Sequence, residues 1–200
     1  SLIIPLLALI VNYSKTAATK ENKEPVFSVL ISFAFVVFGI TNVLQIISSI
    51  SNLTPIVSLT NFEYSVRYGY MYSLILILIP FVYYLVPKIY GREFTYGRLE
   101  SFNAYLLGIS VVATLSLNTL IGINSGFSWN AGANAGNPTI YGEGFLITWS
   151  LISTPYTLIL FLSLLFLLST FLFTLSTLRA IIGGSVTESE TVLEVPGDNY

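Results

Sequence analysis

The uncharged stretch from Tyr68 to Pro87 constrains the fold of this chain more than any other feature of the sequence. As a helix it is long enough to cross the hydrocarbon core of a bilayer, which takes about 20 apolar residues. Glu63 and Arg67 precede it and Lys88 and Arg92 follow it, so charges lie only near its ends. The whole chain has a mean hydropathy of +0.79 and 9% charged residues, against roughly 25% in soluble domains. Because backbone groups in lipid must bond to one another, the sequence predicts an all-α, polytopic helical membrane protein.

Uncharged intervals divide the chain into about five membrane segments. The predicted segments cover residues 1–11, 26–50, 64–86, 102–123 and 145–180. Together they form one helical transmembrane domain over residues 1–182, and residues 183–200 form a polar, acidic tail. The stretch that begins at Ser1 is short for a span, so we expect a truncated or processed helix there.

Proline and glycine predict where the helices bend or end. Pro80 is expected to bend the third segment, because a proline inside a helix removes a hydrogen bond. Pro155 is expected to divide the last segment into an interfacial part and a membrane span. The stretch from Asn124 to Gly142, rich in Gly, Asn and Ala, is expected to be a long connection.

Basic residues are distributed unequally between the two sides of the predicted membrane. Three groups fall on one side: Lys15, Lys20 and Lys23; Lys88, Arg92 and Arg98; and Arg179. Arg67 falls on the other side. Because cytoplasmic loops accumulate basic residues, we expect the tail to be cytoplasmic and the N-terminus to face outward. The chain is therefore expected to be integral to the cytoplasmic membrane.

The sequence contains no histidine and no cysteine. It therefore lacks the imidazole and thiolate ligands that hold haem, zinc and copper, and it lacks the residues of a Ser-His-Asp triad. We expect no catalytic residue, no metal site and no bound cofactor in this chain, which by itself is not expected to be an enzyme. A net charge of −2 also gives no reason to expect a nucleic-acid partner.

Two groups of residues in the third segment are candidate functional sites. Glu63 and Arg67 share a helix face, and they form either an ion pair that anchors the helix end or part of an ion or proton pathway. Tyr64, Tyr68 and Tyr72 also lie along a common side. They form either an aromatic belt with packing contacts or a surface for a quinone, pigment or lipid.

No charged residue occurs between Ser101 and Gly142. An outward-facing surface normally carries some charge, so this stretch favours burial against a partner subunit or adaptation to an acidic environment. Both explanations remain open.

The third segment and its flanks resemble a known family. The segment enters through Thr60-Asn61-Phe62, leaves through Tyr83-Tyr84-Leu85-Val86-Pro87-Lys88, and is followed by Gly91-Arg92. These features are similar to the catalytic subunit of haem–copper oxygen reductases, subunit I, nearest to the cbb3 type. The resemblance implies that the chain matches the last five helices of that subunit. An ungapped count places Ser65 and Arg67 where the family has its haem-ligand histidines.

The replacement of these histidines by Ser65 and Arg67 implies a degenerate or partial relative that cannot ligate haem itself. The resemblance therefore implies a non-catalytic structural or accessory subunit of a respiratory terminal oxidase complex, packed against a haem-bearing subunit. Haem and copper would be held by partner subunits, and lipid or quinone is a further candidate ligand. The alternatives are a small membrane transporter or channel component and a quinone- or pigment-binding membrane module.

Overall fold

The structure is a computed structural model that describes residues 8, 11–12, 15, 25–58, 60–94, 98–134, 138–183 and 185–186. Its long helices are α2 (Pro25–Ser48), α4 (Asn61–Tyr90), α5 (Arg98–Asn134) and α6 (Pro138–Gly183), and its short elements are α3 (Thr54–Val57), β1 (Arg92–Glu93) and β2 (Ser185–Val186). Among the described residues, 4 helices are long and apolar enough to cross a membrane. The predicted helical membrane class is confirmed. The predicted first segment, 1–11, and the tail, 183–200, lie almost wholly outside the described residues.

Helix α4 has defined signals at both ends. The Thr60 hydroxyl accepts a hydrogen bond from the Phe62 backbone N–H at 3.2 Å, which makes Thr60 the N-cap. At the other end Gly91 has φ of 60°, and its N–H donates to the Pro87 carbonyl at 2.9 Å. This left-handed cap suits glycine, which lacks the Cβ that other residues would strain. Between these caps the helix continues past Pro80.

The predicted connection from Asn124 to Gly142 is wrong. Helix α5 continues to Asn134 and α6 begins at Pro138, so both helices extend into this stretch. The expectation rested on Gly and Asn as turn formers, but a helix also keeps its backbone groups paired through such residues. Pro138 suits the start of a helix, because the first N–H has no partner within the helix.

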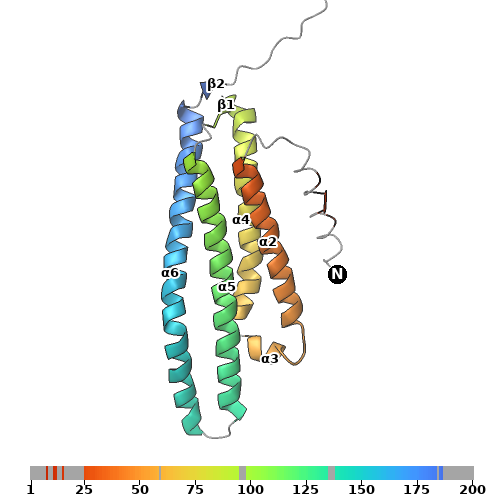
Figure 1. The fold of residues 1–200 in the computed structure, drawn as a ribbon, viewed down its shortest axis with the longest axis vertical. Coiled ribbons are helices and arrows are strands. Elements are labelled where there is room, and N and C mark those ends of the chain that lie inside the picture. The colour runs from red at the N-terminus through yellow and green to blue at the C-terminus, as the bar shows by residue number, and fades with distance from the viewer. Residues whose placement is uncertain are drawn as a thin grey trace, which may run out of the picture.

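Helix α6 is one helix of 46 residues that passes through Pro155, and its apolar stretch, Ser153–Gly183, begins next to this proline. The predicted division into an interfacial part and a membrane span stays a prediction. At about 1.5 Å per residue the helix is about 69 Å long, more than twice the hydrocarbon thickness. Figure 1 shows that the α5–α6 hairpin extends well beyond α3. A single proline removes only one backbone hydrogen bond, which a long helix tolerates.

Helix α5 lies between α6 on one side and the α2–α4 pair on the other (Figure 1). Small residues of α5 let its neighbours approach closely. A Cβ atom at Gly122 would lie 2.0 Å from the backbone nitrogen of Phe62, and one at Gly126 would lie 2.2 Å from the carbonyl oxygen of Ile56. Close approach of this kind is typical of helices packed within membranes.

Helices α4 and α6 are bridged mainly by long side chains. The Tyr72 and Phe166 rings meet edge-on with centroids 5.6 Å apart, and the Tyr83 and Phe173 rings with centroids 4.7 Å apart. Beyond the helix ends, β1 and β2 pair antiparallel, with Arg92 opposite Val186. Both helices therefore end at the same side of the bundle.

The basic residues follow this arrangement. Lys88 is in the last turn of α4 and Arg179 is near the end of α6, so both lie near β1. Arg67 is near the start of α4, at the opposite end of the bundle. Lys88 and Arg179 thus lie at the end opposite Arg67, and the assignment of the β1 end to the cytoplasm stays a prediction.

Candidate functional site

A cavity of about 420 Å³ lies between the end of α2, α3 and the start of α4. We call it the α2–α4 cavity. Gln45 and Ser48 line it from α2, Ser58 from the link after α3, and Glu63 and Arg67 from α4. Carboxylate, guanidinium, amide and hydroxyl groups thus line one space at the end of the bundle away from β1.

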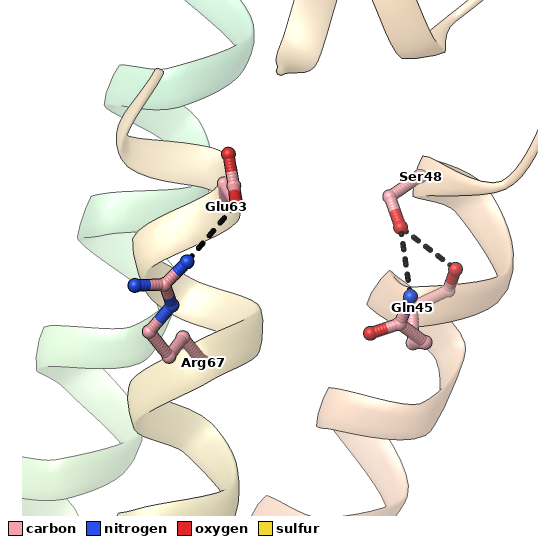
Figure 2. Close-up of polar contacts among 4 residues, drawn as sticks. All are labelled: Gln45, Ser48, Glu63 and Arg67. Carbon is pink, nitrogen blue, oxygen red and sulfur yellow. Dashed lines mark hydrogen bonds and ion pairs between the residues drawn. The ribbon is translucent and has the colours of Figure 1, made fainter. Parts of the chain in front are cut away.

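Glu63 and Arg67 form the predicted ion pair. The Arg67 Nη2 atom donates to Glu63 Oε1 at 3.3 Å (Figure 2). The Glu63 side chain is 51% exposed and the Arg67 side chain is 74% exposed, so the attraction between them is weak. Glu63 also lies in the first turn of α4, where the helix dipole favours a negative charge. This geometry favours the anchoring role over a pathway role.

Gln45 and Ser48 lie across the α2–α4 cavity from the ion pair (Figure 2). The Ser48 hydroxyl donates to the backbone carbonyl of Gln45 at 2.8 Å, and the side-chain amide of Gln45 donates to the Ser48 hydroxyl at 3.4 Å. Sequence reasoning missed both residues. The signal was a glutamine within an apolar helix, where a polar side chain needs a polar partner.

Ser65 and Arg67, where the resemblance places haem-ligand histidines, lie in different surroundings. The Ser65 hydroxyl is buried and contacts the carbonyl oxygens of Asn61, at 3.2 Å, and Leu115 of α5, at 3.4 Å. Arg67 is exposed beside the α2–α4 cavity. Ser65 therefore serves a helix–helix contact, and Arg67 serves the ion pair.

Tyr64, Tyr68 and Tyr72 form a continuous row along α4, which we call the tyrosine row. The rings of Tyr64 and Tyr68 are stacked, with centroids 5.2 Å apart and planes 13° apart. The rings of Tyr68 and Tyr72 are 6.4 Å apart. The row faces a cleft of about 150 Å³ that is lined from the other side by Thr114, Leu115 and Asn118 of α5 and by Ile159 and Ser163 of α6. We call this space the α4–α6 cleft.

Polar contacts connect α4, α5 and α6 beside this cleft. The Asn61 amide donates to the Tyr156 hydroxyl at 2.7 Å and contacts Asn118 Oδ1 at 3.4 Å. No pattern in the sequence predicted these contacts. The polar residue Asn118 within an apolar segment indicated that a polar partner was needed, but Asn61, which it meets, lies on a helix distant in the sequence.

The sequence matches no protein-family model, no curated protein and no solved structure. Among the described residues no group of three or more His, Cys, Asp or Glu side chains could hold a metal ion.

Proposed function

We propose that this chain is a non-catalytic structural subunit of a membrane-embedded electron-transport complex, and that α6 packs against a haem-bearing partner subunit. The observation that carries the proposal is the exposed surface of α6. Within Ser153–Gly183, the apolar 18-residue window has 6% of its residues buried, against 33–44% in the corresponding windows of the other three long helices.

The exposed residues of α6 include a stripe with the spacing of a helix–helix seam. Its apolar members are Leu160, Leu164, Leu167, Phe171 and Leu178, and all five are exposed. Steps of four, three, four and seven residues keep these positions on one side of the helix, and this heptad spacing is typical of helices that pack lengthwise on another helix. The stripe supports a helical partner along α6.

The resemblance of Thr60 to Arg92 to haem–copper oxygen reductases supports an electron-transport complex as the assembly. A chain without histidine or cysteine would leave haem and copper ligation to its partners. Its own contribution would be to cover one side of the haem-bearing subunit and hold it in the bilayer.

The test is affinity purification of the tagged full chain from its native membranes in a mild detergent. Haem absorption and stoichiometric co-purification of haem-bearing subunits are expected. The triple variant L164A/L167A/F171A should reduce the yield of the complex about tenfold while the chain still inserts. A matched triple variant on the exposed side of α4, L74A/L78A/F81A, should leave the yield unchanged.

Purification of the chain without any haem-bearing partner would contradict the proposal. Equal losses of complex in the two triple variants would also contradict it, because α6 would then have no special role. The α4 variant provides this comparison because its three positions are exposed and apolar like those of α6.

A transporter component is a second candidate, and the α2–α4 cavity favours it. Glu63 and Arg67 place both signs of charge beside a space of about 420 Å³ at one end of the bundle. If this function holds, the purified chain in vesicles moves a solute or ion, and the E63Q/R67Q variant slows that movement. Vesicles with the chain that leak no faster than empty vesicles would exclude it.

A further inference from the structure

The Thr114 hydroxyl lies inside the bundle without a hydrogen-bond partner among the described residues. Thr114 is 5% exposed, and among the described residues its hydroxyl forms no hydrogen bond. Other buried hydroxyls donate to a backbone carbonyl, as Thr41 does to Val37 at 2.7 Å and Ser110 to Leu107 at 2.8 Å. Bonding of this kind to the preceding turn is the usual solution for Ser and Thr in a helix. Because an unpaired buried hydroxyl costs free energy, Thr114 points to a missing partner.

Thr114 lines the α4–α6 cleft, and the tyrosine row lines the opposite wall. In the part of the chain that the structure describes, the hydroxyls of Tyr64, Tyr68 and Tyr72 form no hydrogen bond either. The cleft is therefore bordered by several hydroxyl groups that can donate to an acceptor. Its aromatic wall consists of the stacked Tyr64–Tyr68 pair and the tilted ring of Tyr72.

The other polar residues of the cleft already have partners. The Ser163 hydroxyl donates to the Ile159 carbonyl at 2.8 Å, and the Asn118 amide donates to the Thr114 carbonyl at 3.0 Å. Of the described residues that line the cleft, none is charged. A charged head group would therefore have no counter-charge there, and an uncharged ligand fits better.

We propose that the α4–α6 cleft binds the ring of a membrane quinone. A quinone ring is flat and uncharged, its polar atoms are carbonyl acceptors, and its alkyl chain is apolar. The ring can lie against the tyrosine row while a carbonyl oxygen accepts from the Thr114 hydroxyl. A volume of about 150 Å³ suits one six-membered ring, since an apolar cavity of about that size binds benzene.

This proposal does not depend on the function proposed above, because binding can be measured on the full chain without partners. The protein in nanodiscs is incubated with a short-chain alkylated benzoquinone and separated by size exclusion, and retained quinone is measured by mass spectrometry. Saturable retention approaching one quinone per chain is expected, above that of empty nanodiscs. T114V keeps the shape of the side chain and removes the hydroxyl. It should weaken binding about tenfold, which corresponds to about 1.4 kcal/mol.

Thermal stability distinguishes a ligand contact from a structural role. Without quinone, T114V should be at least as stable as the wild type, because it removes an unpaired buried hydroxyl. The matched control is T119V on the same helix, where the hydroxyl donates to the Leu115 carbonyl at 2.8 Å. T119V should lower stability and leave quinone retention unchanged. Y68F, which keeps the ring at an exposed position, should also reduce retention.

Retention equal to that of empty nanodiscs would overturn the proposal. Unchanged retention in both T114V and Y68F would overturn it as well. If T114V lowers stability and does not affect retention, the hydroxyl binds a structural water, and the quinone assignment is wrong.

Discussion

Asn103 and Ser169 bind one another through three hydrogen bonds across the interface of α5 and α6. The Asn103 amide donates to the Ser169 carbonyl at 3.0 Å, and the Ser169 hydroxyl lies 2.6 Å from Asn103 Oδ1 and 3.1 Å from the Asn103 carbonyl. Both side chains are buried. Since neither has water as an alternative partner, this pair fixes the rotation of α6 about α5.

Substitution of Ser169 by alanine should destabilise the chain by about 1–2 kcal/mol, because the Asn103 side chain loses a buried partner. The measurement is thermal unfolding in detergent. Ser163→Ala is the control, since that exposed hydroxyl donates to the Ile159 carbonyl of its own helix, and its effect should be much smaller. Equal effects of the two variants would show that the interhelical pair contributes nothing of its own.

Substitution of Gly122 by alanine should destabilise the chain by about 1–3 kcal/mol, because a Cβ there would lie 2.0 Å from the backbone nitrogen of Phe62. Backbone cannot rotate away as a flexible side chain can. Gly39→Ala is the matched control, since a Cβ at Gly39 meets nothing within 4 Å. That variant should gain up to about 1 kcal/mol from helix propensity. Chemical denaturation of the two variants should give changes in the free energy of unfolding that have opposite signs.

Gly91→Ala should cost about 1 kcal/mol of stability, because φ is 60° at this position and alanine is strained there. Gly183→Ala is a suitable comparison, since a Cβ at Gly183 meets nothing within 4 Å and its φ is not in the left-handed range. Thermal unfolding of the two variants under the same conditions provides the measurement. A neutral result at Gly91 would mean that the chain rearranges after α4 at little cost.

Arg67→Gln should change the stability of the isolated chain by less than about 0.5 kcal/mol, because the Glu63–Arg67 pair is exposed. A double-mutant cycle with Glu63→Gln measures the coupling. If the chain is a structural subunit, Arg67→Gln should lower the yield of the assembled complex and leave turnover per intact complex unchanged. Normal assembly with reduced turnover would instead indicate a pathway role for the guanidinium.

The long apolar stretches predicted the positions of the described membrane helices well, because lipid leaves few alternatives to a helix. The prediction for residues 64–86 lies within the observed α4, Asn61–Tyr90. The error at Asn124–Gly142 came from local turn preferences, which a continuing helix overrode. Helix ends are the least certain part of such a prediction, since they depend on caps such as Thr60 and Gly91.

The candidate site was only partly predictable. Glu63 with Arg67, and the tyrosine row, followed from helical spacing within one segment. Thr114 and the Asn61–Tyr156 contact did not, because they depend on how α4, α5 and α6 are rotated toward one another. No local pattern in the sequence specifies that rotation.

The rings that bridge α4 and α6 also determine how wide the space between these helices is. Tyr72 meets Phe166, and farther along Tyr83 meets Phe173, so aromatic side chains act as spacers where backbones would otherwise close up. The Asn61–Tyr156 hydrogen bond holds the far end. A molecule dissolved among the acyl chains can therefore enter from the side between the Asn61–Tyr156 and Tyr72–Phe166 contacts, and the helices need not separate to admit it.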